Sequence, residues 1–183
     1  MDDYAWFSRE RYPELADAYC FTYVRGLTPA ELMTRLGVGA DDCSRMTLGE
    51  LTEAGFGNGM VGAGAVGDWV LMVEANGLAG ITEEIIVPLS AGTRLVSQFF
   101  LEVKMLDWFY WVEDGTIRYE SNNEGYSERL PDELVETMAR VGPTCSSLGD
   151  LHFVLAERLT GIRLTRQLLE ESTYLCGVVP GPW

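Results

Sequence analysis

The chain has 183 residues and carries 28 acidic and 13 basic side chains, which gives a net charge of −15 with its single histidine neutral. This acidity argues against a nucleic-acid-binding function, which requires a basic face, and against docking on anionic lipid, which requires clusters of Lys and Arg. A hydrophobic content of 47% and an aromatic content of 11% indicate a folded globular protein rather than a disordered chain.

The length favours a single domain over residues 1–183. No apolar run approaches the roughly 20 residues of a membrane-spanning helix, and no signal peptide is visible, so we expect a cytoplasmic protein without membrane contact. Cys20, Cys43, Cys145 and Cys176 form no CxxC pair. We expect no metal and no other cofactor, and the spacing leaves the redox state of the cysteines open.

The N-terminal part, residues 1–55, is expected to be helical. Apolar residues recur at i+3 and i+4 across residues 14–26, which indicates a mostly buried helix. A second helix begins after Thr28, where Pro29 and Glu31 complete a capping-box pattern. The same pattern at residues 47–50 predicts a third short helix that ends at Gly55.

Residues 56–67 are rich in glycine and match the GxGxxG pattern twice, over 57–62 and 62–67. In a dinucleotide-binding fold this pattern follows a strand and opens a helix, whereas here a helix precedes it and a strand follows it. We therefore expect a flexible loop rather than a phosphate-binding site.

Residues 68–121 are expected to form an antiparallel sheet. Asn76-Gly77 and Asp114-Gly115 are hairpin-turn signals between apolar runs. The pattern predicts a meander of five strands, over residues 68–75, 80–87, 93–102, 106–113 and 116–120.

The C-terminal part, residues 130–171, is expected to be helical again. One helix opens at Pro131, a longer one covers 147–160, and Thr165 caps a short final helix. The remaining tail is expected to pack against the domain or to trail from it. The order of elements predicts an α+β fold, an antiparallel five-stranded meander flanked by N-terminal and C-terminal helices and covered on one face.

Aromatic and acidic residues cluster around the fourth and fifth expected strands. Alternation places Trp108 and Tyr110 on one face, where they are either sandwiched under helices or exposed to a partner. The nearby carboxylates form either a solvated edge or a surface that steers a basic partner. The candidate partner-binding residues are Trp108, Tyr110, Glu113, Asp114, Glu120 and Glu124.

Glu74 follows four hydrophobic residues within the first expected strand, so it faces the interior or a pocket. The candidate pocket lies between the sheet and the glycine-rich loop, lined by Glu74, Trp69, Gly62 and Gly64. His152 is interpreted as a core-edge or surface residue rather than a catalytic base. A pair with Cys145 is conceivable, although no nucleophile signature surrounds that cysteine.

Four phrases of the sequence, at residues 20–32, 69–77, 89–94 and 159–165, together resemble a family of small acidic actinobacterial proteins of unknown function, frequent in Streptomyces-type genomes. The resemblance implies a cytoplasmic actinobacterial protein, and twelve arginines against one lysine fit a GC-rich genome. It brings no activity and no catalytic residues.

Several functions remain open at this point. The leading hypothesis is a non-catalytic interaction module, of the immunity or accessory kind, that binds a basic protein or peptide. The alternative is a small-molecule-binding or accessory enzyme domain that uses the candidate pocket. A third hypothesis is a homodimer joined through an exposed sheet face.

Overall fold

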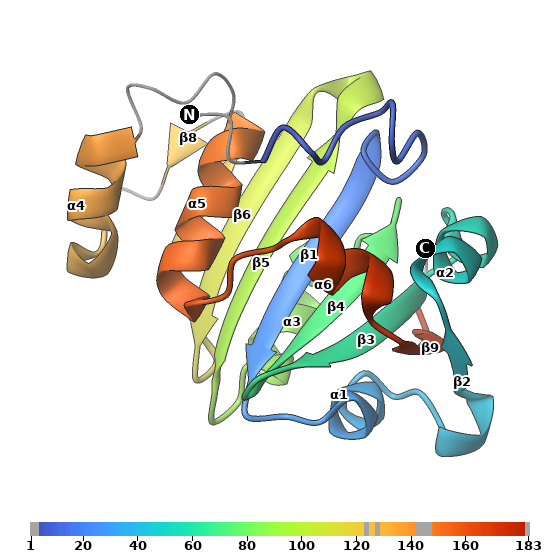
Figure 1. The fold of residues 1–183 in the computed structure, drawn as a ribbon. Helices are drawn as coiled ribbons and strands as arrows, with labels where there is room; N and C mark the ends of the chain where they lie inside the picture. Colours follow the sequence, from blue (N-terminus) through green and yellow to red (C-terminus); the bar gives the residue numbers. More distant parts are fainter. Residues whose placement is uncertain (1–3, 123–124, 127–128, 142–147, 182–183) are drawn as a thin grey trace.

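The computed structural model describes residues 4–122, 125–126, 129–141 and 148–181 (Figure 1). The described residues form one antiparallel sheet of nine strands in the order β2-β9-β3-β4-β1-β5-β6-β7-β8. The strands are β1 (Ala18–Arg25), β2 (Ser44–Met46), β3 (Met60–Val66), β4 (Trp69–Ala75), β5 (Arg94–Leu101), β6 (Leu106–Glu113), β7 (Thr116–Asn122), β8 (Gly125–Tyr126) and β9 (Tyr174–Val178).

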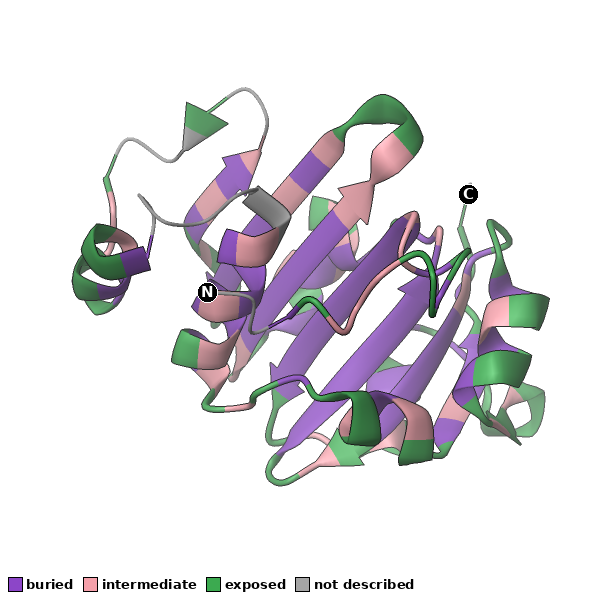
Figure 2. Cartoon of the chain, turned by 45° about the horizontal axis from the view of Figure 1, so that its top comes forward, coloured by how far each residue is buried: buried purple, intermediate pink, exposed green. Residues whose placement is uncertain are grey.

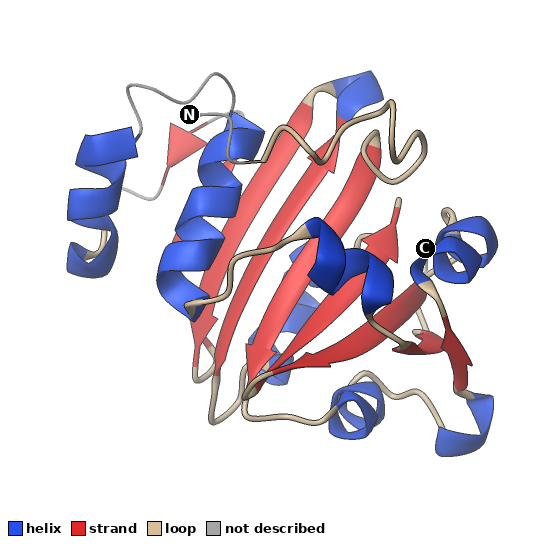
Figure 3. Ribbon diagram, viewed as in Figure 1, coloured by secondary structure: helices blue, strands red, loops and turns tan. Residues whose placement is uncertain are grey.

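Helices lie on both sides of this sheet (Figure 3). The α-helices of the described residues are α1 (Pro29–Arg35), α2 (Leu48–Gly55), α3 (Glu83–Leu89), α4 (Asp132–Val141), α5 (Leu148–Thr160) and α6 (Arg166–Glu171). Short 3₁₀ turns are η1 (Ala40–Asp42), η2 (Ala79–Ile81) and η3 (Glu102–Lys104). Both expected capping boxes are confirmed, because Thr28 caps α1 with Glu31 and Thr47 caps α2 with Glu50.

The α+β class is confirmed, but the five-stranded meander is wrong. β1 lies between β4 and β5, and the C-terminal β9 is inserted between β2 and β3, so the chain leaves the sheet and returns to it. Hairpins within a meander join neighbours in sequence, whereas these pairings join segments far apart in the chain, and no local pattern encodes them.

The helix expected over residues 14–26 is wrong, because most of that segment is strand β1. Seven of its eight residues are buried, since helices or other chain segments cover both of its faces. A strand that is buried on both faces reads as a continuous apolar run, and such a run also satisfies helical spacing. The aromatic and β-branched residues within it, such as Phe21, Tyr23 and Val24, favour the strand.

The flexible loop expected over residues 56–67 is also wrong, because residues 60–66 form β3 between β4 and β9. A Cβ atom on Gly62 would collide with Leu51, and one on Gly64 would lie 3.2 Å from the ring of Tyr174. The glycines therefore allow other side chains to pack closely on this strand, which is a recognised use of glycine within sheets.

The strand expected over residues 80–87 is a 3₁₀ turn followed by helix α3. Ile85, Ile86 and Val87 have high strand propensity, which explains the error. The acidic pair Glu83 and Glu84 occupies the first turn of α3, where carboxylates interact favourably with the helix dipole.

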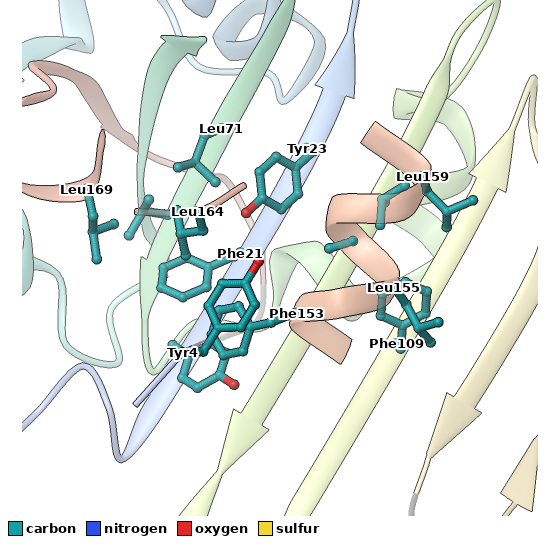
Figure 4. Packing of buried hydrophobic residues seen from close by; sticks show 14 of the residues in the cluster. Tyr4, Phe21, Tyr23, Leu71, Phe109, Phe153, Leu155, Leu159, Leu164 and Leu169 are labelled. Atoms are coloured by element: carbon teal, nitrogen blue, oxygen red, sulfur yellow. The ribbon is translucent and has the colours of Figure 1, made fainter. Parts of the chain in front are cut away.

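Two hydrophobic layers enclose the sheet, and the expectation that helices cover one face only is wrong. On the first face, residues from α2, α5, α6 and the N-terminal segment pack on odd-numbered residues of β1, β4 and β6. Figure 4 shows Tyr4 and Phe153 close to Phe21, with Leu155 of α5 beside Phe109 and Leu159 further along the same helix. On the second face, residues of α1 and α3 pack on Val24, Met72 and Leu95.

The central strands are almost wholly buried, and exposed residues gather on the outer helix surfaces and hairpins (Figure 2). Within the described ranges, no helix combines the length and the apolar character needed to cross a membrane.

Candidate functional site

The second face of the sheet carries a group of aromatic and acidic side chains that we call the acidic–aromatic patch: Trp108 and Tyr110 of β6, Glu120 of β7 and Glu83 of α3. Tyr110 lies opposite Glu120 in the β6–β7 ladder, and its hydroxyl donates to Glu83 Oε1 at 3.5 Å. Trp108 packs against Phe99 at 5.9 Å between ring centroids and is half-buried.

The carboxylates of this patch change the pKa of the Tyr110 hydroxyl. Burial, Glu83 and Glu120 together raise the pKa of Tyr110 to about 12. Two carboxylates therefore act on one phenol beside a partly exposed indole ring. Such a combination favours a cationic group, because a cation is attracted both to carboxylates and to the face of an aromatic ring.

The other candidate partner-binding residues lie elsewhere. Glu113 is paired with Arg94 at 3.2 Å, and Arg94 also reaches Glu133 of α4. Asp114 has a positive φ in the β6–β7 turn and accepts a hydrogen bond from the Gly92 N–H at 2.8 Å. Both residues thus have local structural roles. Glu124 lies outside the described residues.

The candidate pocket residues do not converge. Trp69 and Glu74 occupy opposite faces of β4, and Trp69 belongs to the hydrophobic layer of the first face. Gly62 and Gly64 of β3 also face the first side, where Leu51 and Tyr174 occupy the space above them. The structure therefore does not bring Glu74 together with the other three residues.

Glu74 instead belongs to a closed polar cluster under η2. Its two carboxylate oxygens accept hydrogen bonds from the backbone N–H groups of Ala79 and Gly80 at 2.9 and 2.8 Å. Glu74 is fully buried, and this burial raises its pKa to about 7, although the backbone N–H groups of Gly80 and Ala79 oppose the shift.

Three further buried side chains, Cys20, Thr22 and Ser97, complete the cluster under η2. The Thr22 and Ser97 hydroxyls lie 2.7 Å apart, and the Cys20 thiol lies 3.5 Å from Ser97 Oγ. Burial and the charge of Glu74 raise the pKa of the Cys20 thiol, which disfavours the reactive thiolate. The cluster therefore anchors η2 to the sheet rather than exposing a nucleophile.

A second buried polar array joins three elements on the first face. His152 of α5 lies between Asp107 of β6 and Ser121 of β7. Its Nδ1 is 2.5 Å from Asp107 Oδ1, and its Nε2 is 3.0 Å from Ser121 Oγ. This connectivity is that of a serine nucleophile with its base and orienting acid. However, the exposed fractions of Asp107, Ser121 and His152 are only 4%, 2% and 1%, so a substrate has no access to the hydroxyl.

Sequence reasoning missed Glu83, whose helix was taken for a strand, and it missed the Ser121–His152–Asp107 array. The Thr82-Glu83-Glu84 run is a helix-start signal that could have located α3. No local signal could have found the array, since its members lie on three elements. Cys145, the conceivable partner of His152, lies outside the described residues.

Metal ligation has no support in the described part of the chain, where no group of three or more His, Cys, Asp or Glu side chains is arranged to hold an ion. Cys20, Cys43 and Cys176 are free thiols.

Comparison with known proteins gives one family. Neither the search of curated proteins nor the search of solved structures finds a match. A family model described as a family of unknown function (DUF6461) matches residues 1–182, almost the whole chain. The chain therefore belongs to the DUF6461 family.

Proposed function

We propose that the protein is a non-catalytic interaction module that binds a basic protein or peptide through the acidic–aromatic patch. The observation that carries this proposal is that Glu83 accepts a hydrogen bond from the Tyr110 hydroxyl and that Glu120 pairs with Tyr110 across the β6–β7 ladder, on the strand that carries the partly exposed Trp108. A lysine or arginine side chain placed there meets two carboxylates and an aromatic face.

The wider charge distribution supports the same proposal. Between residues 27 and 93 the chain exposes eight carboxylates, on α1, η1, α2, α3 and the β3–β4 turn, against two arginines. Most of these carboxylates lie on helices of both faces, and a predominance of one sign of charge accelerates the encounter with a basic partner and makes association sensitive to salt. The acidic surface then brings the partner to the patch, and the patch selects its side chain.

The biological setting belongs to the same proposal. The resemblance described above and the excess of arginine over lysine support an actinobacterial, Streptomyces-type origin and a cytoplasmic location. An immunity-type or accessory role fits a small acidic protein that neutralises a basic partner.

The test uses isothermal titration with two synthetic peptides of equal length, one rich in Lys and Arg and one rich in Glu. The Glu83→Gln/Glu120→Gln variant should bind the basic peptide about fivefold more weakly. The matched control is Asp41→Asn/Asp42→Asn, which changes the net charge equally but lies on η1, away from the patch.

Equal loss of affinity in both variants would show that only overall charge matters and would refute the patch. Binding of the acidic peptide, or binding unchanged between low and high salt, would refute the module itself. Trp108→Ala distinguishes the contribution of the ring to binding from that of the carboxylates. It should weaken binding of the basic peptide without changing the dependence of binding on salt.

A further inference from the structure

A cleft with a volume of about 400 Å³ opens on the first-face side of the molecule, well away from the acidic–aromatic patch. Three segments that are distant in sequence form it, namely residues 11–15, the start of α2 and Glu170 of α6. Its volume lies in the range of about 300–1,000 Å³ that is usual for ligand sites. Residues that line the cleft include Arg11, Tyr12, Glu14, Leu15, Leu48, Gly49, Glu53 and Glu170.

The floor of this cleft is apolar and firmly built. Leu15 and Leu48 are 1% and 7% exposed and belong to the hydrophobic layer of the first face, together with Tyr12. The Tyr12 hydroxyl donates to Glu170 Oε1 at 2.7 Å, which holds the phenol in place. The floor therefore offers a fixed surface to a short aliphatic chain.

The basic group of the cleft is already neutralised. Nε and Nη2 of Arg11 both donate to Glu170 Oε1, at 2.9 and 2.7 Å. Glu170 also accepts from Arg166, and these donors lower its pKa to about 2. At the start of α2, the Glu50 carboxylate accepts from the Thr47 N–H and offsets the positive end of the helix.

Two carboxylates at the cleft remain uncompensated. Neither Glu14 nor Glu53 has a side-chain hydrogen bond or ion pair with any other described residue, and both are exposed. The groups left to interact with a ligand are therefore mainly acceptors and negative charges above an apolar floor.

We infer that this cleft binds an alkylguanidinium or alkylammonium group, with its aliphatic part on Tyr12, Leu15 and Leu48 and its charge near Glu14 and Glu53. An arginine or lysine side chain and a free small amine share this chemistry. The inference does not depend on the acidic–aromatic patch, because Tyr12, Leu15 and Leu48 belong to the first face whereas Tyr110 belongs to the second.

Binding is tested by titration calorimetry with three probes of similar size: butylguanidinium, pentanol and pentanoate. We expect butylguanidinium to bind and the neutral and anionic probes to bind at least tenfold more weakly. A capped arginine dipeptide distinguishes the two sources. If the dipeptide binds at least as tightly as butylguanidinium, the natural ligand is the side chain of a protein partner. If the dipeptide does not bind, the natural ligand is a free small amine.

Gly49 allows a direct steric test. A Cβ atom at Gly49 meets no other atom within 4 Å, so Gly49→Ala should bind normally, and Gly49→Phe should place a ring in the cleft and abolish binding. Glu14→Gln/Glu53→Gln should weaken binding about three- to tenfold, while Asp41→Asn/Asp42→Asn leaves it unchanged.

Three results would overturn the inference. The first is an affinity for pentanoate or pentanol equal to that for butylguanidinium, and the second is full binding of butylguanidinium by a folded Gly49→Phe variant. The third is equal weakening of binding in Glu14→Gln/Glu53→Gln and Asp41→Asn/Asp42→Asn. Because the patch also attracts cations, the cleft is measured separately in the Glu83→Gln/Glu120→Gln background, where butylguanidinium should still bind and where adding Gly49→Phe should abolish the remaining binding. Failure of the patch and failure of the cleft are therefore separate results.

Discussion

At the scale of single residues, burial decides what a polar side chain does. Glu74 lies in a strand like its apolar neighbours, yet its carboxylate accepts two backbone hydrogen bonds from η2 and fixes that turn on the sheet. Buried polar groups are tolerated when they are hydrogen-bonded in this way. Its unusual position was visible in the sequence, but the partner was not, because η2 was taken for a strand.

The raised pKa of Glu74 makes stability depend on pH. The unfolded chain releases this proton near pH 4.5, whereas the folded protein keeps it until about pH 7. The stability that protonated Glu74 contributes is therefore full below pH 4.5 and is lost as pH rises through 7. Relative to Glu74→Gln, the free energy of unfolding should fall by about 3 kcal/mol between pH 4 and pH 8.

Urea unfolding at several pH values measures this difference. The matched control is Glu84→Gln, which makes the same chemical change at an exposed carboxylate outside this cluster. Parallel curves for Glu74→Gln and the unmodified protein would contradict the assignment.

A substitution at Gly80 tests how tightly η2 packs on the same cluster. A Cβ atom at this position would collide with Thr22 Oγ1 and lie 2.5 Å from Cys20 Sγ. Gly80→Ala should therefore destabilise the protein by about 1–3 kcal/mol through overpacking. Thermal unfolding measures the effect against Gly49→Ala, whose methyl group enters open space. Similar melting temperatures for the two variants would mean that η2 does not close over the cluster.

At the scale of elements, glycine content misled the interpretation of β3. A glycine-rich run is typical of a flexible segment, but here the small residues let α2 and β9 approach the sheet. The capping boxes of α1 and α2 were predictable because each depends on residues three positions apart. Strand pairing has no such local signature.

A double-mutant cycle tests the close packing on β3. Gly62→Ala should destabilise the protein by about 1–3 kcal/mol, because its methyl group would overlap Leu51. Leu51→Ala alone should cost about 2–5 kcal/mol through the cavity it leaves. Together the two changes should cost at least about 1 kcal/mol less than their sum, because the new methyl group partly fills that cavity. Chemical denaturation gives the four values, and strict additivity would show that the two residues do not share this space.

At the scale of the whole molecule, tertiary contacts create groupings that no segment contains. The Ser121–His152–Asp107 array joins β7, α5 and β6 inside the first face. Its three side chains are connected as in a catalytic triad, but they are buried like a hydrogen-bond network of a protein core. The acidic–aromatic patch likewise draws Glu83 from α3 to the strands that carry Tyr110 and Glu120.

The array should contribute to stability and not to catalysis. His152→Ala should destabilise the protein by about 2–5 kcal/mol, since it leaves a cavity in the first-face core and removes the buried hydrogen-bond partner of Ser121. A fluorophosphonate probe should leave Ser121 unlabelled in the native protein, as that residue is 2% exposed. Intact-mass measurement with Ser121→Ala as the control checks this. Labelling that is lost in both Ser121→Ala and His152→Ala would instead assign a catalytic serine.

The sequence by itself determined the α+β class, the capped helices, four of the central strands and the shared face of Trp108 and Tyr110, because these follow from local periodicity and short-range capping. It also determined the net charge of −15. Only the tertiary structure decided the strand order, the burial of Glu74 away from Trp69, the approach of Glu83 to Tyr110 and the cleft between residues 11–15 and α2. Each of these depends on contacts between distant segments, and packing across the sheet selects them rather than any preference of the residues themselves.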